Sequence, residues 1–328
     1  MQKFLDKHKK NPVCDEMMDF FFKVRHFLNM YDCADDKYVT YAELDKDGDM
    51  LLHLYCVDPS ENISLRLSQG KASVMFSATF LPVNYFKEMI SGDISDYAVY
   101  AHSPFDTSNK RVIVGRDVSS RYTRRNINEY TKIADYIRKM VTSRHGRYMI
   151  FFPSYSYMQS VYDIYIKKYE NTILELSAAL NDENSNDENT AKKGQEQQKE
   201  YEGKTVYNII KQPSNMKEAD KESFLSLFVE NEKTDIAGFC VLGGIFSEGI
   251  DLRGDALIGV AVVGTGIPMV CRQRNILRDY FDSHGKNGYQ YAYVYPGMNK
   301  VLQAAGRVIR TDTVSYTHLR AHETLMNL

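Results

Sequence analysis

The stretch that decides the fold is Gly238-Phe-Cys-Val-Leu-Gly-Gly-Ile-Phe-Ser-Glu-Gly-Ile-Asp-Leu252. It begins with a short apolar, β-rich run, as expected for a buried strand of a parallel sheet. Two glycines end this run, and Ser247, Glu248 and Asp251 then surround the flexible Gly249. Because ligands of α/β proteins bind beyond the carboxyl ends of the strands, this loop is predicted to belong to a ligand site.

Similar short apolar runs lie before and after this stretch, and helical segments separate them. Such alternation predicts an α/β fold with a mainly parallel sheet flanked by helices. The predicted strands are residues 73–77, 111–115, 148–152, 257–263 and 291–295, with a helix over 83–90 and an amphipathic helix over 15–31.

An acidic segment, Asp45-Lys-Asp-Gly-Asp49, lies between two β-rich runs at residues 38–41 and 50–57. This arrangement predicts a hairpin turn between two strands. The segment also resembles a calcium-binding loop, but Met50 stands where that loop needs glycine and Cys56 where it needs glutamate. The turn is therefore the favoured interpretation.

The composition is that of a globular chain of one or two domains. The 328 residues are 43% hydrophobic and 26% charged, and the formal net charge is −2. This charge excludes a globally basic nucleic-acid binder but allows a local groove of lysine and arginine. No apolar run reaches the roughly 18 residues of a membrane helix, so we expect a cytoplasmic protein without membrane contact.

The cysteines are odd in number, widely spaced and without a C-x-x-C pair. This spacing disfavours a disulfide framework, a zinc site or an iron–sulfur cluster in this chain. We expect no metal site and reduced thiols, mostly in the core, at Cys14, Cys33, Cys56, Cys240 and Cys271.

Residues 181–204 have almost no apolar side chains, which predicts a disordered surface insertion. The insertion runs into Gly203-Lys204-Thr205, which superficially resembles a phosphate-binding P-loop. The P-loop needs another glycine five residues before Gly203, where Gln198 stands, and no strand precedes it. We reject the P-loop interpretation.

The most specific signal is the pattern Gln303-Ala-Ala-Gly-Arg-Val-Ile-Arg310. Arg307 and Arg310 are three residues apart and are expected to share one helix face. Two planar guanidinium groups suit the oxygens of a transferring phosphoryl group, and Gly306 allows close backbone approach. A solvated helix with basic residues is the alternative for the motif alone.

Hydroxyl residues end two other predicted strands. Ser77 and Thr79 precede a predicted helix, and Ser154 and Tyr155 follow an apolar strand. Hydroxyl and aromatic groups of this kind bind phosphates and stack on bases, although either group alone could be a helix cap.

A basic segment, residues 116–125, contains Arg121, Arg124 and Arg125 together with hydroxyl residues and a tyrosine. Its composition suits contact with a nucleic-acid backbone, whereas a solvated charged surface is the alternative.

In this order the segments resemble motifs III to VI of superfamily 2 helicases. The wording Ser-Glu-Gly-Ile-Asp, with Ser103-Pro-Phe105 upstream, is similar to the XPD/DinG branch of DNA helicases in particular. The resemblance covers roughly residues 50–312, with motif III at 77–79, motif IV at 152–154, motif V at 247–251 and motif VI at 303–310.

The resemblance implies two RecA-like domains with ATP between them and single-stranded DNA as partner. It implies a catalytic role for Arg307 and Arg310, with Gln303 beside them. It assigns nucleotide binding to Glu248, Gly249, Asp251 and Gly306. DNA binding falls to Ser77, Thr79, Ser154, Tyr155 and Ser247, and the basic segment adds Arg121, Arg124 and Arg125.

The sequence departs from the family because it contains neither G-x-x-x-x-G-K-[ST] nor D-E-x-H. These motifs cradle the phosphates and hold Mg²⁺, so we expect this chain alone not to hydrolyse ATP. In the family they lie upstream of motif III, together with the iron–sulfur cysteines. We therefore expect Met1 to be internal to a longer gene whose missing N-terminal half is a partner of this one.

The resemblance also suggests domain boundaries. Residues 1–66 are expected to end an arch region and return to the first motor domain, and residues 67–118 to complete that domain. Residues 119–313 are expected to form a nearly complete second RecA-like domain.

Residues 314–324 read Val-Ser-Tyr-Thr-His-Leu-Arg-Ala-His-Glu-Thr, which matches a translated sequencing-library adapter. We expect residues 314–328 to be adapter-derived rather than native, and a polar native tail is the alternative. The four-residue spacing of His318 and His322 is then without meaning for metal binding.

Two other functions compete with a helicase motor. A degenerate motor domain would bind nucleic acid or a protein partner without turnover. A Rossmann-like nucleotide enzyme is disfavoured because the sequence at Gly264-Thr-Gly266 lacks the last glycine of G-x-G-x-x-G.

Overall fold

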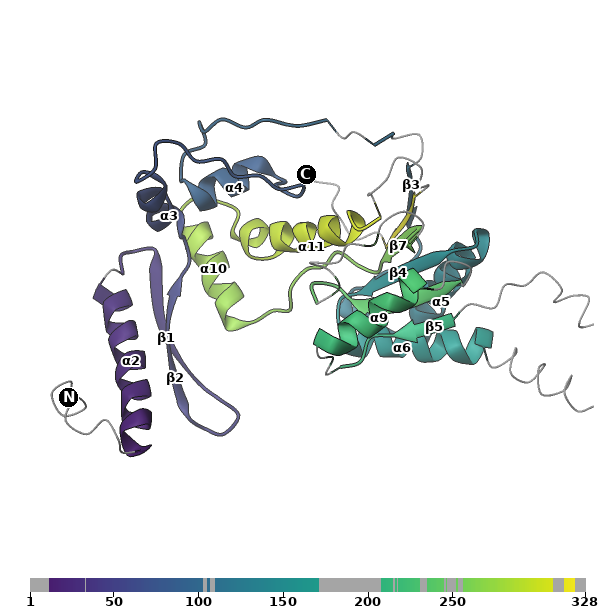
Figure 1. Cartoon of the computed structure of the whole chain (residues 1–328), viewed down its shortest axis with the longest axis horizontal. Coiled ribbons are helices and arrows are strands. Elements are labelled where there is room, and N and C mark those ends of the chain that lie inside the picture. Colours follow the sequence, from purple (N-terminus) through teal and green to yellow (C-terminus); the bar gives the residue numbers. More distant parts are fainter. Residues whose placement is uncertain are drawn as a thin grey trace, which may run out of the picture. The chain divides into compact units, whose positions relative to one another are not determined.

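A computed structural model gives two compact units (Figure 1). The first comprises Met1–Phe76, Phe80–Ala98 and Val270–Ala292, and the second comprises Ser77–Thr79, Val99–Met269 and Tyr293–Leu328. The structure describes residues 12–32, 34–102, 105–106, 110–170, 208–214, 216, 218–230, 235–244, 246, 252, 256–308 and 316–321. The insertion predicted at 181–204 lies outside these residues, and the domain boundaries expected at 66, 118 and 313 stay predictions.

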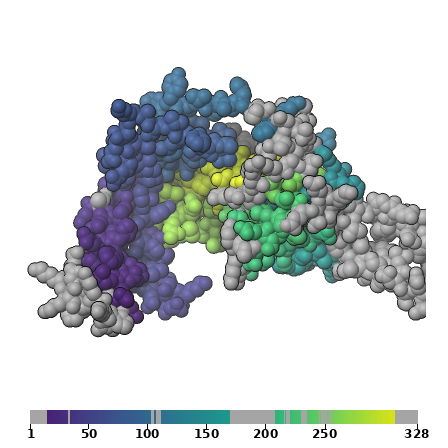
Figure 2. Space-filling view, viewed as in Figure 1, coloured from purple at the N-terminus to yellow at the C-terminus, as the bar shows by residue number. Residues whose placement is uncertain are grey.

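The first unit joins one hairpin to several helices. Its elements are α2 (Pro12–Asp32), β1 (Tyr38–Leu44), β2 (Met50–Cys56), α3 (Ser60–Leu67), α4 (Val83–Ile90) and α10 (Arg272–Ser283). The helices predicted at 15–31 and 83–90 are therefore confirmed. The end of the hairpin is exposed (Figure 2), with Leu44 and Met50 at 71% and 72% exposure.

The acidic segment is the predicted hairpin turn. Strands β1 and β2 pair antiparallel, with Leu44 opposite Met50. One oxygen of the Asp45 carboxylate accepts hydrogen bonds from the backbone N–H groups of Asp47 and Asp49, each at 2.9 Å. Gly48 takes a positive φ of 88°, which glycine adopts without a steric penalty.

The strand predicted at residues 73–77 is wrong. No regular structure forms there, and Val74 and Phe76 are 85% and 90% exposed. A strand needs a neighbour to bond its backbone N–H and C=O groups, and none of the described strands pairs with this segment.

The second unit is built on a parallel sheet. The strand order is β3-β8-β7-β4-β6-β5, and every pair is parallel. The α/β fold with a parallel sheet is therefore confirmed. Its strands are β3 (Lys110–Gly115), β4 (Arg147–Phe152), β5 (Asn208–Lys211), β6 (Ile236–Val241), β7 (Gly259–Val262) and β8 (Tyr316–Ala321). Its helices are α5 (Ile127–Ser143), α6 (Tyr155–Tyr165), α9 (Glu218–Glu230) and α11 (Tyr295–Ala305).

Helices cover both faces of the central strands. The buried Phe239 ring in β6 lies 5.4 Å from that of Tyr162 in α6. At the preceding residue, Gly238, a Cβ atom would come within 2.9 Å of Phe228 in α9. Because neighbouring residues of a strand point to opposite faces, α6 and α9 lie on opposite faces of β6. This burial on both faces explains why the strand sequences are continuous apolar runs.

The strand predicted at residues 291–295 is also wrong, because this run is helical. A π-helical turn, Gln290–Val294, leads directly into α11. The buried residues of α11 are Gly297, Val301 and Ala304, at intervals of four and three, as in a helix with one apolar face. The aromatic content of residues 291–295 suggested a strand, whereas the three- and four-residue spacing of the apolar residues that follow is that of a helix.

Part of the segment expected to derive from an adapter forms β8. This strand pairs through its backbone with both β3 and β7. A parallel ladder needs only backbone groups of suitable length, so the pairing carries no information on the origin of the segment, which stays a prediction.

Within the described part of the chain, no helix is long and apolar enough to cross a bilayer. Three cysteines are free thiols there: Cys240 is buried, whereas Cys56 and Cys271 are only partly buried. Burial raises the pKa of the Cys240 thiol, which is therefore protonated and unreactive at neutral pH.

Candidate functional site

Polar groups collect where β4 and β5 end. Ser154 follows β4 and caps α6, because its hydroxyl accepts the backbone N–H of Tyr157 at 3.3 Å. The next side chain, Tyr155, donates its hydroxyl to the carbonyl of Pro213, beyond β5. The motif expected to bind phosphates and bases therefore lies beyond the carboxyl ends of the strands.

Gln212 links two neighbouring strand ends at this edge. Gln212 is 5% exposed. Its side-chain oxygen accepts the backbone N–H of Val241 at 2.9 Å, and its backbone N–H donates to the Phe239 carbonyl at 2.9 Å. Burial raises the pKa of the Tyr155 phenol, against the opposing effect of its hydrogen bond to Gln212. Tyr155 is therefore a neutral hydrogen-bond donor at physiological pH. No sequence motif singled out Gln212.

The loop after β7 brings a third strand end to the same place. Gly264 has a φ of 96°, and a Cβ atom there would lie 2.6 Å from the Ser120 hydroxyl and 4.0 Å from Pro153. The segments that follow β3, β4 and β7 therefore meet at Gly264, where only glycine fits. We call these strand ends, with Gln212 and Tyr155, the carboxyl edge.

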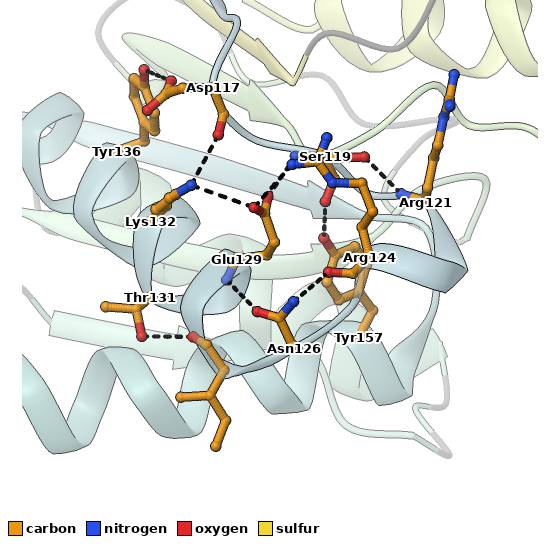
Figure 3. Close-up of polar contacts among 11 residues, drawn as sticks. Asp117, Ser119, Arg121, Arg124, Asn126, Glu129, Thr131, Lys132, Tyr136 and Tyr157 are labelled. Atoms are coloured by element: carbon orange, nitrogen blue, oxygen red, sulfur yellow. Dashed lines mark hydrogen bonds and ion pairs between the residues drawn. The ribbon is translucent and has the colours of Figure 1, made fainter.

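The basic segment between β3 and α5 is organised by one buried acid, Glu129 (Figure 3). This residue is 4% exposed. Its carboxylate accepts the Ser119 N–H at 2.9 Å and lies 3.4 Å from both Arg124 Nη2 and Lys132 Nζ. The buried charge is thus compensated by two cations and a backbone donor, as buried charges require.

Asn126 fixes the start of α5, from which Glu129 projects. Its side-chain oxygen accepts the backbone N–H of Glu129 at 3.0 Å. An N-cap residue followed three positions later by glutamate is a helix-start pattern. The pattern Asn126-x-x-Glu129 is the signal by which the sequence could have indicated Glu129.

Arg125 joins the basic segment to α6. Its Cζ lies 4.5 Å from the centroid of the buried Tyr157 ring and 5.4 Å from that of Tyr122. Its Nε donates to the Ser120 carbonyl at 3.1 Å. Because Tyr157 is also capped by Ser154, the structure brings the predicted basic residues together with the predicted hydroxyl motif.

The other two arginines differ from Arg125. Arg124 is 59% exposed in its side chain although it contacts Glu129. The Arg121 side chain points away from the Glu129 carboxylate (Figure 3). Both therefore present positive charge at the surface.

The structure corrects the expected geometry of motif VI. Helix α11 contains Gln303 but ends at Ala305, with Gly306 as its C-cap, so Arg307 lies beyond the helix. Glycine is a poor helix former, and the Arg307 N–H bonds the Ala304 carbonyl at 3.2 Å in a tighter turn. Arg307 is therefore not part of α11, and because Arg310 lies outside the described residues, the shared face expected for the two arginines stays a prediction.

Helix α11 nevertheless packs against the carboxyl edge. A Cβ atom on Gly266, in the loop after β7, would lie 2.8 Å from the Gly297 carbonyl. A Cβ atom on Gly243, after β6, would lie 3.0 Å from the Lys300 side chain. Motif VI thus begins beside the ends of β6 and β7, and Lys300 is a cation there that the sequence motifs did not include.

The remaining predicted residues give less information. Ser77 is exposed and Thr79 is partly buried, and their hydroxyls are 3.2 Å apart. The predicted residues outside the described part of the chain are Ser247, Glu248, Gly249, Asp251 and Arg310.

Residues 137–315 match the family model described as the helicase C-terminal domain. The chain belongs to this family. The match contains the last part of α5, the carboxyl ends of β4, β5, β6 and β7, and motif VI.

Two solved structures are similar over nearly the whole chain. One is titled an XPD helicase (TM-score 0.56, 15% identity) and the other apo XPD (TM-score 0.55, 17% identity). They cover 97% and 96% of this chain, and the chain covers 51% and 54% of theirs. The fold of the chain is thus similar to that of about half of these XPD structures, as the sequence resemblance implied.

A curated relative from Methanocaldococcus jannaschii is named a probable ATP-dependent helicase. It is 24% identical over 93% of this chain, which covers 41% of the relative. The chain spans about half the length of the XPD structures and less of this relative.

Proposed function

We propose that the chain carries the second motor domain, with the C-terminal part of the first, of an ATP-dependent DNA helicase that translocates on single-stranded DNA and unwinds duplex. The observation that supports this most is the carboxyl edge, where hydroxyl groups, aromatic rings and arginines of the segments after β3 and β4 meet the ends of β5 and β7. Groups of these kinds bind a nucleic-acid backbone and unpaired bases.

In this proposal the DNA backbone contacts the surface beside Ser154 and Tyr155. Arg121 and Arg124 supply positive charge, and the Ser154 hydroxyl lies at the N-terminus of α6, where the helix dipole favours phosphate. Arg125 has its guanidinium over Tyr157 and holds the surface in shape. Ser77, Thr79 and Ser247 keep the DNA-binding roles that the family resemblance gives them.

The nucleotide would lie near motif VI. Gln303, Gly306, Arg307 and Arg310 belong to this side of the nucleotide site, with Glu248, Gly249 and Asp251 of motif V. The residues that the structure describes contain no group of three or more His, Cys, Asp or Glu side chains that fits a metal ion. In this proposal Mg²⁺ is held by the D-E-x-H motif that this sequence lacks, so ATP hydrolysis is assigned to the complete protein.

We therefore propose that ATP turnover requires the P-loop and Mg²⁺-binding motifs that this sequence lacks. A purified sample of this chain should show no DNA-stimulated ATPase activity. Turnover that Arg307→Ala abolishes would contradict this proposal. A degenerate motor domain that only binds nucleic acid is the second candidate function. An adjoining coding sequence with an intact G-x-x-x-x-G-K-[ST] motif would favour the enzyme.

Single-strand binding is the direct test. We expect a fluorescein-labelled oligonucleotide to bind in a fluorescence-anisotropy titration, with an affinity that falls as salt rises, because each phosphate contact contributes a log–log slope of about −0.7. Arg124→Ala should reduce the magnitude of this slope. Lys23→Ala, which removes an exposed cation of α2, is the matched control. An affinity that does not change with salt would contradict the proposal.

A further inference from the structure

Tyr122 stands out at the carboxyl edge because its ring is exposed and a guanidinium group lies against it. It is 83% exposed and begins a 3₁₀ turn, Tyr122–Arg124. The turn is closed by backbone hydrogen bonds from Arg124 to Arg121 (2.9 Å) and from Arg125 to Tyr122 (3.3 Å). An exposed aromatic residue therefore has arginines on both sides of it in a fixed turn.

The Tyr122 ring is contacted by the Arg125 side chain. The Arg125 guanidinium lies over Tyr122 at 5.4 Å and over Tyr157 at 4.5 Å. Tyr157 is 1% exposed, and it is anchored in α6. A cation close to two rings is attracted to both, and the hydrogen bond from Arg125 Nε to the Ser120 carbonyl orients the guanidinium. Tyr122 is thus the outer layer of a stack that starts in the core.

We propose that Tyr122 is a stacking platform for an unpaired nucleobase. Every base has a π-face, so stacking on an aromatic ring is tolerant of sequence, and a supported ring loses little conformational freedom on binding. Arg121 and Arg124 lie on either side to contact the phosphates of the same strand. Bases of a duplex are already stacked, so the platform selects single strands. This inference rests on the proposed single-strand binding and identifies the group that reads the base.

The chain contains no tryptophan, which makes the test direct. Tyr122→Trp introduces a single indole whose emission a stacked base quenches. The probes are an oligothymidylate and an abasic oligonucleotide of the same length and charge. We expect quenching by the oligothymidylate and much less by the abasic strand. Tyr97→Trp, at a tyrosine that is 98% exposed in the first unit, is the matched control and should not respond.

Affinity gives a second readout. Tyr122→Ala should weaken binding of oligothymidylate by about 5- to 150-fold and binding of the abasic strand much less. Tyr122→Phe keeps the ring and should retain most of the affinity. Circular dichroism and the urea midpoint establish that each variant is folded.

The outcomes separate the two proposals. If the parent chain binds the oligonucleotide but the emission of the Tyr122→Trp variant is unchanged, or if Tyr122→Ala binds as tightly as the parent, the stacking inference is wrong and single-strand binding stands. If the parent binds neither strand at any salt concentration, both fail.

Discussion

The guanidinium of Arg125 lies 4.5 Å from the ring centroid of Tyr157, so a cation of the basic segment packs on an aromatic ring of the core. Tyr157 is also held by Ser154 and donates its hydroxyl to the Ser119 carbonyl at 3.4 Å. Through these two contacts the segment after β3 and the helix after β4 form a single surface. In the proposed function, this surface would transmit nucleotide-dependent motion to DNA.

Arg125→Ala should lower the free energy of unfolding by about 1–2 kcal/mol, because it removes a partly desolvated cation–π contact and the hydrogen bond to Ser120. Arg125→Lys should recover part of this loss, since ammonium keeps the charge but not the planar fork. Urea unfolding followed by circular dichroism measures the effect. Lys23→Ala, at an exposed position, should change stability by less than about 0.5 kcal/mol.

Replacement of the buried acid should be more severe. Glu129→Ala leaves the Ser119 N–H without its acceptor and removes the charge beside Arg124 and Lys132, so we expect a loss of about 3 kcal/mol. Glu129→Gln keeps an acceptor and should lose less. Equal losses in the two variants, measured by urea unfolding, would show that the hydrogen bond to Ser119 is unimportant.

The sequence predicted the central strands well because of how they are buried. Strands β4, β6 and β7 have helices or neighbouring strands against them, and their residues form continuous apolar runs that the sequence displays. The run at 73–77 is also apolar, but it is exposed. The prediction failed there because composition does not show whether a neighbouring strand exists. The run at 291–295 was misassigned because five residues are too few to distinguish a buried strand from a helix.

The candidate site was predictable only in part. Motif spacing indicated Ser154, Tyr155 and the arginines, and the structure brings these groups together at one edge. The motif spacing did not indicate that Arg125 would pack on Tyr157, or that Gln212 would join β5 to β6. Such contacts link residues that are far apart in the chain or buried in the fold, and no local pattern encodes them. The helix-start pattern at Asn126 and Glu129 is the exception, since capping is local.

Stability should depend on pH through Asp135 in α5. Burial acts to raise the pKa of its carboxyl, but hydrogen bonds from Lys168 (2.6 Å) and Tyr169 outweigh it and lower the pKa below the usual value. A depressed pKa in the folded state gives stability that is present above the unfolded pKa of about 3.9 and is lost as pH falls through the folded value. Asp135→Asn should therefore unfold more easily than the parent at pH 7.

The free energies of unfolding of the parent and of Asp135→Asn should converge as the pH is lowered below about 4. The difference at pH 7 should be small, about 0.2–1 kcal/mol, because the Asp135 and Lys168 side chains are 36% and 42% exposed. Urea midpoints measured across this range give the result. Asp19→Asn, at a more exposed carboxylate of α2, should have little effect. A difference that grows on acidification would contradict the assigned sign.

The last prediction concerns motif VI in the complete protein. If Arg307 and Arg310 reach the γ-phosphate, replacement of either by alanine should lower kcat far more than it weakens ATP binding, by about 10³- to 10⁵-fold. The reason is that the charge which these arginines meet develops mainly in the transition state. Lysine should rescue poorly, because a point charge does not reproduce the planar fork.

Lys300→Ala, one helix turn before Gln303, is a comparison variant that removes a cation next to Gly243 instead. Steady-state ATPase assays separate kcat from KM. A normal kcat with only a raised KM would show that the arginines contribute to binding alone, and the turn after α11 would then have a structural role.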